Sequence, residues 1–206
     1  MQKPKKILIT GGHATPALAV IDAIQSFRPL TELVFVGRMY NNYEKTKSFE
    51  YGQVTSRGIR FIHLEAGRST RSFTFEGLKN ILKIPSGLLH ALQIIRREKP
   101  DIILSFGGYI ALPITYMGWL NSVPIFTHEQ TIHPGLANRI IAKLAAKVFV
   151  AFPEAAAFFN SANLVVSGNP LRKSVFEKSR KIAIPKGFPC IYVTGGSLGA
   201  HAINMC

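Results

Sequence analysis

The segment KILITGGHATPALAV, residues 6–20, decides the fold of this chain. It opens with Lys6–Thr10, a run of aliphatic and β-branched side chains that predicts a short buried strand. Two glycines then interrupt the apolar run. Thr15 followed by Pro16 predicts a helix start near Pro16, because threonine caps helices and proline is tolerated in the first turn. A strand, a glycine turn and a helix in this order form the first unit of a parallel α/β sheet.

The same alternation continues outward from this segment. Strands are predicted at Lys6–Thr10, Glu32–Val36, Arg60–Leu64, Asp101–Ser105, Pro124–Thr127, Lys147–Val150 and Leu164–Ser167. Helical periodicity runs from Leu78 to Ile95, with Leu88, Leu89 and Leu92 expected to face the core, and another helix is predicted near 135–145. Strands that are apolar on both faces need helices on both sides, so the predicted fold class is α/β, a doubly wound, Rossmann-like parallel sheet.

The composition narrows the possible classes of protein. The chain has 206 residues, 47% of them hydrophobic, and 25 Lys and Arg against 11 Asp and Glu give a net charge of +14. Such a charge favours polyanions, anionic lipid surfaces or phosphorylated substrates as partners. Two cysteines predict neither a disulfide framework nor a zinc site, which favours a reducing, cytoplasmic setting. Residues 102–127 carry no formal charge, but glycines and prolines divide them into strand, loop, helix and strand rather than a membrane span.

Residues 179–189 are polar and contain prolines, which predicts an interdomain linker. The predicted domains are a Rossmann-like domain at 1–178 and the start of a second domain at 190–206, where a strand at Cys190–Thr194 precedes a glycine turn. One strand-loop-helix unit cannot bury both of its faces. We therefore expect the chain to be the first half of a two-domain protein.

Glycine-rich and polar turns follow several predicted strands, where ligands bind in parallel sheets. After the first strand come Gly11, Gly12 and His13, whose backbone N–H groups and following helix N-terminus suit an anion. A tight turn with a packed histidine is the alternative interpretation. The later turns contain Gly107, Gly108 and Tyr109, then His128, Glu129, Gln130 and Thr131, and finally Gly168–Arg172, whose arginine can clamp a phosphate.

Two other kinds of site are not supported by these turns. The dinucleotide-binding fingerprint lacks its third glycine, and the second strand ends in Gly37 and Arg38 rather than in an acidic residue. A metal site built from His128, Glu129 and His133 is disfavoured because adjacent side chains point apart. We therefore predict no metal and no cofactor.

Six short sequence segments, taken in their order along the chain, resemble those of the MurG family. The resemblance is carried by Thr10–His13 with Pro16–Val20, Phe106–Tyr109, His128–Gln130, Pro134–Arg139, Gly168–Arg172 and Gly195–Ala200. That family has two Rossmann-like domains of the GT-B type and transfers N-acetylglucosamine from its UDP sugar to undecaprenyl-diphospho-N-acetylmuramoyl-pentapeptide, in peptidoglycan synthesis. There are two departures: the family's first loop usually reads Gly-Gly-Thr-Gly-Gly-His and is shorter here, and Thr131 stands where the family has asparagine.

The resemblance implies an inverting, metal-independent transfer in which the acceptor hydroxyl attacks the anomeric carbon and UDP leaves. His13 is the candidate general base because its intrinsic pKa is near neutral, with His128 and Glu129 as alternatives. The candidate substrate-binding residues are Thr10, Gly11, Gly12, Gly107, Gly108, Tyr109, His128, Glu129, Gln130, Thr131, Asn138, Arg172 and Ser197.

The resemblance also implies an apolar, basic-rimmed membrane patch. Its residues are Phe73, Phe75, Leu78, Lys79, Ile81, Leu82 and Lys83, and a core-facing helix with solvated lysines is the alternative. The expected partners are UDP-N-acetylglucosamine, the undecaprenyl-linked muramoyl-pentapeptide and an anionic membrane surface, at the cytoplasmic face of the cell membrane. No nucleic acid is expected, because no nucleic-acid-binding motif is present. A non-catalytic lipid-diphosphate or membrane-binding module and an unrelated nucleotide-dependent Rossmann enzyme remain alternatives.

Overall fold

The computed structural model describes residues 5–40, 46–66, 84–159, 163–177 and 193. The chain forms two compact units, Met1–Val175 and Phe176–Cys206. The predicted linker at 179–189 and the predicted second domain at 190–206 lie almost entirely outside the described residues. The fold below is therefore that of the first unit.

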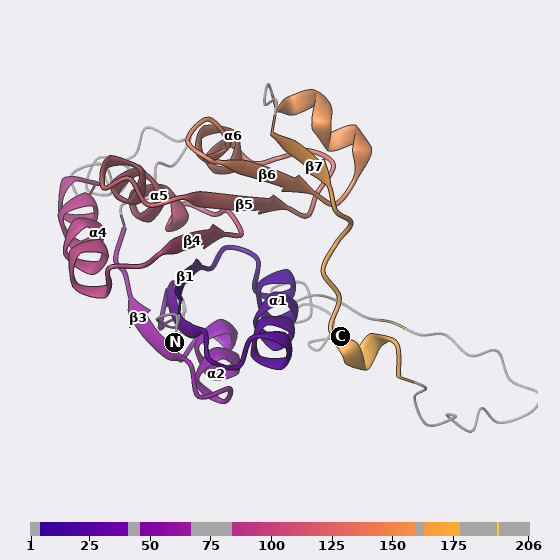
Figure 1. Cartoon of the computed structure of the whole chain (residues 1–206), viewed down its shortest axis with the longest axis horizontal. Helices are drawn as coiled ribbons and strands as arrows, with labels where there is room; N and C mark the ends of the chain where they lie inside the picture. Colours follow the sequence, from indigo (N-terminus) through magenta and orange to yellow (C-terminus); the bar gives the residue numbers. More distant parts are fainter. Residues whose placement is uncertain (1–4, 41–45, 67–83, 160–162, 178–192, 194–206) are drawn as a thin grey trace, which may run out of the picture. The chain divides into compact units, whose positions relative to one another are not determined.

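The first unit is built on a seven-stranded, wholly parallel sheet (Figure 1). Its strands are β1 (Lys6–Thr10), β2 (Glu32–Gly37), β3 (Arg60–His63), β4 (Ile102–Ser105), β5 (Ile125–Glu129), β6 (Lys147–Val150) and β7 (Leu164–Val166). In space they follow the order β3-β2-β1-β4-β5-β6-β7. All seven predicted strands are present, and the predicted doubly wound sheet is confirmed.

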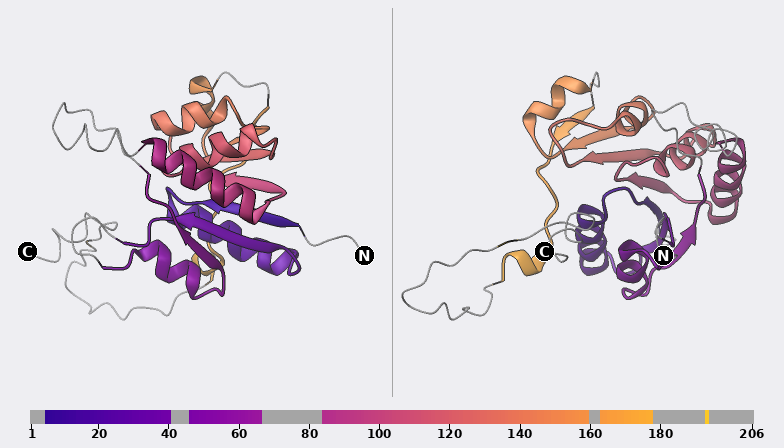
Figure 2. Two further views of the ribbon diagram at one scale, coloured as in Figure 1. Left: turned by 90° about the vertical axis from the view of Figure 1, so that its left-hand side faces the viewer. Right: turned by 180° about the vertical axis from the view of Figure 1, so that it is seen from behind.

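Helices cover both faces of the sheet, as Figures 1 and 2 show. They are α1 (Ala14–Phe27), α2 (Phe49–Thr55), α4 (Ile84–Glu98), α5 (Ala111–Leu120) and α6 (Leu136–Ala142), with short 3-10 helices at Pro153–Phe158 and Lys173–Val175. One core cluster packs α4, α5 and α6 against strand residues such as Leu8 and Ile103. A second packs α1 and α2 against Ile9 and Phe35. Successive strand residues thus enter opposite cores, which is why the strands are apolar on both faces.

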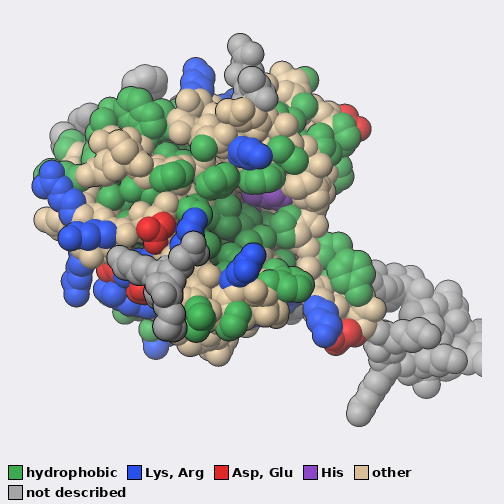
Figure 3. All heavy atoms as spheres, viewed as in Figure 1, with side chains coloured by type: hydrophobic (Ala, Val, Ile, Leu, Met, Phe, Trp, Pro, Cys, Tyr) green, Lys and Arg blue, Asp and Glu red, His purple; other side chains and the backbone are tan. Residues whose placement is uncertain are grey.

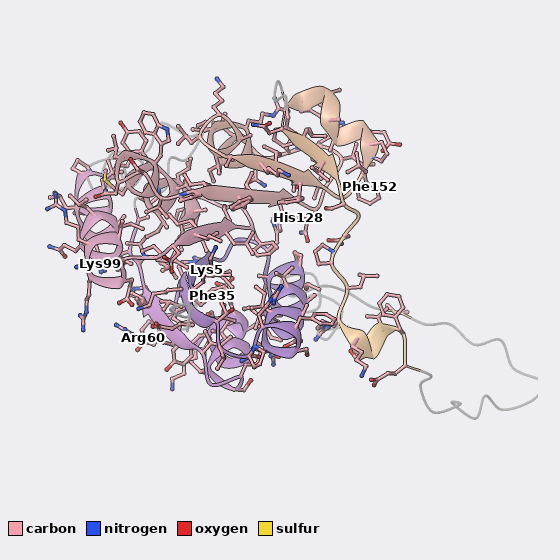
Figure 4. The ribbon with its side chains drawn as sticks, viewed as in Figure 1. Lys5, Phe35, Arg60, Lys99, His128 and Phe152 are labelled. Atoms are coloured by element: carbon pink, nitrogen blue, oxygen red, sulfur yellow. The ribbon has the colours of Figure 1, made fainter. Side chains whose placement is uncertain are left out.

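The strand order reverses between β1 and β4. β1 pairs with β2 on one side and with β4 on the other, and the register places Thr10 beside Ser105 and Ser105 beside Thr127. The turns after these strands therefore start next to one another, at the type of switch point where α/β sheets bind ligands. Figure 4 shows His128 and Phe152 at this carboxyl edge, with Lys5, Arg60 and Lys99 at the amino edge.

Three details of the sequence prediction are corrected. α1 begins at Ala14, and its N-cap is His13 rather than Thr15, because the turn closes directly after the strand. β5 continues through His128 and Glu129, which were expected to follow the strand. In α4, Leu89 is 63% exposed and the core side is formed by Ala91, Ile94 and Ile95, because the helix is apolar around more than one face and packing selects the face that turns inward.

Candidate functional site

Two glycine turns meet at the switch point. A Cβ on Gly12 would overlap the carbonyl oxygen of Gly107, and a Cβ on Gly108 would lie 2.9 Å from the Gly12 Cα. Gly107 and Gly108 both have φ of +79°, a backbone conformation that side chains other than glycine's rarely adopt. The turn after β4 is anchored by the Gly107 N–H, which donates to Ser105 Oγ at 3.2 Å. The structure thus joins two turns that the sequence predicted to share one rim.

His13 lies directly after the first of these turns, at the start of α1. Its Nδ1 is 3.1 Å from the carbonyl oxygen of Phe106. Because a carbonyl oxygen only accepts, Nδ1 carries the proton and donates, and Nε2 is left with its lone pair. His13 is the N-cap, but its side chain makes no capping bond, so the first-turn N–H groups of α1 have no side-chain cap. This tautomer has the lone pair that a general base needs.

His128 lies nearby at the end of β5, and its ring is 5.9 Å from the Phe106 ring. Its side chain donates from Nε2 to the carbonyl oxygen of Gly168, 3.1 Å away, which ties the turn after β7 to β5. Burial lowers the pKa of His128, and the nearby His13 lowers it further. His128 is therefore neutral near pH 7, and its buried Nδ1 has no partner among the described residues.

Glu129 is the centre of a buried hydrogen-bond network. Its Oε2 accepts from Asn138 Nδ2 at 2.8 Å, and its Oε1 accepts from the Thr131 hydroxyl at 2.7 Å and the Thr131 N–H at 2.9 Å. Thr127 donates to Asn138 Oδ1 at 3.2 Å. A Cβ on Gly107 would lie 2.8 Å from Asn138 Nδ2, so the network also touches the turn after β4. Both oxygens of Glu129 are thus used in fixing α6 and the loop after β5.

Glu50 is a site residue that the sequence did not reveal. It lies in the first turn of α2, and its carboxylate packs against Gly11, where a Cβ would overlap it, and 2.8 Å from the position of a Cβ on Gly37. Burial raises the pKa of Glu50 to about 7, while the Arg38 charge and a hydrogen bond from the Gly12 N–H oppose this. The sequence signals only the start of this helix, because Ser48 caps α2 by accepting from the Tyr51 N–H.

The remaining predicted residues divide into three groups. Thr10 is fully buried, and its hydroxyl has no partner among the described residues; Arg172 Nε is likewise buried and unpartnered. Tyr109 lies against the Arg38 guanidinium, which is 5.6 Å from the Tyr109 ring centroid, and Gln130 is partly buried directly after β5. Ser197 lies outside the described residues. Within the described ranges, no three His, Cys, Asp or Glu side chains gather closely enough to hold a metal ion.

An apolar groove of about 410 Å³ opens between α4, α5 and α6. Its wall includes Leu88, Leu112, Tyr116 and Ile140, and it reaches Tyr109 in the turn after β4. Around it, Trp119 is 49% and Leu136 is 73% exposed. Figure 3 shows hydrophobic side chains at the upper left, around α5, and basic side chains down the left side. None of the described helices is long and apolar enough to cross a membrane, and the predicted patch residues Phe73, Phe75, Leu78, Lys79, Ile81, Leu82 and Lys83 lie outside the described residues.

Solved structures share this fold. One is MurG of Acinetobacter baumannii, with a TM-score of 0.59 and 22% identity over 81% of this chain and 44% of that one. Another is a putative UDP-N-acetylglucosamine 2-epimerase of Listeria monocytogenes, with a TM-score of 0.58 and 14% identity over 81% of this chain and 45% of that one. Enzymes of different chemistry thus share the fold, so the fold alone does not identify the reaction.

Sequence comparison identifies the family to which the chain belongs. A Bacillus cereus protein named "UDP-N-acetylglucosamine--N-acetylmuramyl-(pentapeptide) pyrophosphoryl-undecaprenol N-acetylglucosamine transferase 2" is 34% identical over 97% of this chain, which spans 57% of that protein. The model of the glycosyltransferase family 28 N-terminal domain matches residues 10–150, from the end of β1 to the end of β6. That match covers well over half of the chain and includes both glycine turns, His13 and the Glu129 network, and so the chain belongs to glycosyltransferase family 28.

Proposed function

We propose that this chain is the acceptor-binding half of an enzyme that transfers N-acetylglucosamine from its UDP sugar to undecaprenyl-diphospho-N-acetylmuramoyl-pentapeptide. The proposal is supported by the activity that names the Bacillus cereus relative and by its 34% identity over 97% of this chain. It is also supported by the turns after β1, β4, β5 and β7, whose residues contact one another at one edge of the sheet. We propose that UDP-N-acetylglucosamine and the lipid-linked acceptor meet at this edge.

The observation that carries the proposal is the tautomer of His13. With Nδ1 donating to Phe106, the lone pair of Nε2 is available to take the proton from the attacking sugar hydroxyl. The new bond forms between that oxygen and the anomeric carbon as the bond to UDP breaks. Glu129 is less suited as the base, because Asn138 and Thr131 already use its two oxygens. We assign the Glu129 network the role of holding the loop after β5 in place.

The first turn of α1 supplies a place for the acceptor's negative charge. N-terminal N–H groups of a helix attract anions through the helix dipole, and α1 starts without a side-chain cap. Arg172, at the turn tied to His128 through Gly168, adds a guanidinium on the same edge. These groups favour a diphosphate-bearing ligand over a neutral one.

We further propose that the protein binds peripherally to the cytoplasmic face of the cell membrane. The exposed apolar side chains around the groove, such as Trp119 and Leu136, and the chain's net charge of +14 support contact with an anionic lipid surface. The groove begins at Tyr109, next to the glycine turn, so lipid contact and sugar transfer would occur on adjacent parts of the domain. Flotation with vesicles of anionic and of neutral lipids tests this part.

The transfer itself is tested by joining this chain to the C-terminal domain of the Bacillus cereus relative. The hybrid should move labelled N-acetylglucosamine from its UDP sugar to a short-chain polyprenyl-diphospho-muramoyl-pentapeptide. His13→Asn should lower kcat by at least about a hundredfold, the usual contribution of a general base. His90→Asn, on α4 away from the rim, is the matched control and should leave kcat unchanged.

The non-catalytic module is distinguished by the same materials. If the hybrid shows no transfer while the chain alone binds the acceptor, a lipid-diphosphate-binding module is favoured. If the chain binds neither the acceptor nor anionic vesicles, both functions are wrong. Transfer that survives His13→Asn would move the base to another residue.

A further inference from the structure

The backbone donors of the first glycine turn are already occupied within the chain. The Gly11 N–H donates to the carbonyl oxygen of Val36 at 3.1 Å. The Gly12 N–H donates to the Glu50 carboxylate. A turn that sequence reasoning treats as an open anion cradle therefore holds an anion from its own chain, delivered by a helix more than thirty residues away.

The fit of Glu50 in this position depends on the absence of side chains around it. The carboxylate fills the space that a Cβ on Gly11 would take, and it lies 2.8 Å from where a Cβ on Gly37 would be. Gly11 in the turn after β1 and Gly37 at the end of β2 have no side chains where they face the carboxylate. The same concave, glycine-lined shape would accept a phosphate oxygen in place of the carboxylate oxygen.

The electrostatic surroundings leave the carboxylate only weakly held. Arg38, directly after β2, is the charged side chain whose field acts on Glu50, and it also contacts the Tyr109 ring in the turn after β4. Other titratable side chains on the adjoining elements include His13 after β1, Lys47 and Tyr51 near the start of α2, and His63 on β3, whose Nδ1 accepts from the Met39 N–H. Lys6 on β1, Glu32 on β2, Asp22 on α1 and Arg60 on β3 are held in ion pairs of their own. Burial outweighs the favourable contacts and raises the pKa of Glu50. Glu129, by contrast, has side-chain donors on both oxygens.

We propose that Glu50 is an internal counter-anion of the Gly11–Gly12 turn, which holds the turn closed until the diphosphate of a substrate displaces it from the Gly12 N–H. The proposal deepens the proposed function, because it assumes that a diphosphate reaches this edge of the sheet. Glu50 is a positioning residue rather than a catalytic one. A diphosphate cannot share the Gly12 N–H with an ionised Glu50, since like charges at hydrogen-bonding distance repel strongly.

When the diphosphate enters, Arg38 gains a second anion to pair with. Its guanidinium already acts on Glu50 and lies against Tyr109. Arg38 can therefore pair with the Glu50 carboxylate when no ligand is bound, and with the phosphate when the diphosphate occupies the Gly11–Gly12 turn. The exchange makes the turn selective for anions strong enough to displace a carboxylate, and it excludes neutral sugars from this position.

Titration of the whole 206-residue chain with inorganic pyrophosphate, followed by calorimetry at pH 8, tests this role. Glu50→Gln removes the negative charge and Glu50→Ala also removes the acceptor. Both variants should bind pyrophosphate at least about tenfold more tightly than the natural chain, because they remove the repulsion between the Glu50 carboxylate and the bound pyrophosphate. Glu32→Gln, which makes the same change of net charge at the first residue of β2, on the opposite edge of the sheet, should bind as the natural chain does.

A merely structural role for Glu50 gives the opposite result. If Glu50 only braces the turn, both variants bind pyrophosphate more weakly or equally, and that outcome overturns the proposal, as does a failure of every variant to bind. Should Glu50→Ala fail to fold, Glu50→Gln, which keeps the shape of the side chain, decides the question. Because pyrophosphate binding needs no sugar transfer, the result stands whether or not the proposed enzyme activity is found.

The source of the diphosphate is resolved by two further titrations. Farnesyl diphosphate carries the diphosphate of a polyprenyl acceptor, and UDP carries that of a donor. Tighter binding of farnesyl diphosphate alone by Glu50→Gln assigns the displaced position to the acceptor, and tighter binding of UDP alone assigns it to the donor. No change for either ligand overturns the proposal.

Discussion

Two carboxylates lie near the carboxyl edge of this sheet, and their surroundings differ: Glu129 is fully buried, whereas Glu50 is partly buried. Glu129, at the end of β5, is 1% exposed and accepts from Asn138 on one oxygen and from Thr131 on the other. Glu50, in the first turn of α2, packs against Gly11. Burial disfavours its charged form and raises its pKa to about 7. Each carboxylate lies beside a glycine turn, but only the first is fully satisfied by side-chain donors.

The difference separates two uses of a buried charge. A carboxylate with hydrogen bonds on both oxygens is fixed, and removing it leaves its donors without partners. A carboxylate that is buried with few donors is strained in its charged form, so a proton, a cation or a competing anion can change its state. We therefore expect Glu129 to have a structural role, and Glu50 to change its state when a proton or a ligand binds. Removing each group in turn tests this contrast.

The largest effect is expected from Glu129→Ala. Asn138 and the Thr131 N–H would lose their acceptor in a buried setting, which costs about 3 to 4 kcal/mol of the free energy of unfolding. Urea denaturation of the chain measures this loss. The exposed Glu154→Gln is the matched control and should change stability by no more than about 0.5 kcal/mol. A loss below about 1 kcal/mol for Glu129→Ala would show that the network does not hold the loop.

The next effect concerns Glu50 and pH. Its pKa is about 7 in the folded chain against an ordinary value of 4.5, so the folded state keeps a proton that the unfolded chain has already lost between these values. The free energy of unfolding therefore falls as the pH rises through this window, by about 3 kcal/mol in total. The difference between the natural chain and Glu50→Gln isolates this contribution.

Measurement of both proteins by urea denaturation between pH 4.5 and 8 checks the sign. Relative to Glu50→Gln, whose amide does not ionise, the natural chain should be most stable at pH 4.5 and should lose stability steadily as the pH rises past 7. Other groups, including His128 with its lowered pKa, contribute alike to both proteins and cancel. A difference that does not vary with pH would mean that folding leaves the pKa of Glu50 at its ordinary value.

A smaller loss is expected from Gly12→Ala, which tests the junction of the two turns. The added Cβ would overlap the Gly107 carbonyl oxygen, a backbone atom that cannot rotate away, so we expect a cost of about 2 kcal/mol. Gly52→Ala in α2 is the control, because a Cβ there meets nothing within 4 Å and should stabilise the helix by about 0.5 to 1 kcal/mol. Thermal unfolding compares the two. Equal behaviour of both variants would mean that the turns separate easily.

The fold was predictable because the pattern that specifies it is local. β1 and β6 match their predicted bounds, since an apolar run ended by glycine or polar residues is visible without tertiary information. The phase of α4 was not predictable in the same way. Leu89 and its neighbours are apolar around more than one face, and only packing shows that Ala91 and Ile94 turn inward while Leu89 is exposed.

The site was predictable only where its residues follow the strands. Thr10, His13 and Glu129 are found by asking what comes at each strand's carboxyl end. Glu50 comes from α2, a short helix with only Val54 buried, so hydrophobic periodicity gave no signal for it. Its meeting with Gly11 depends on how α2 packs beside β1, which no local pattern reports.

The smallest predicted effect concerns two buried hydroxyls that are neighbours in the sheet. Thr10 pairs in register with Ser105; the Ser105 Oγ accepts from the Gly107 N–H, whereas the Thr10 hydroxyl has no partner among the described residues. Thr10→Val should therefore raise the free energy of unfolding by about 0.5 to 1 kcal/mol, because it removes an unsatisfied buried group, and Ser105→Ala should lower it by about 1 kcal/mol. Urea denaturation measures both changes. If Thr10→Val is stabilising yet weakens pyrophosphate binding, the hydroxyl is kept for a ligand and belongs with Glu50; if it is destabilising, Thr10 has a structural partner and belongs with Glu129.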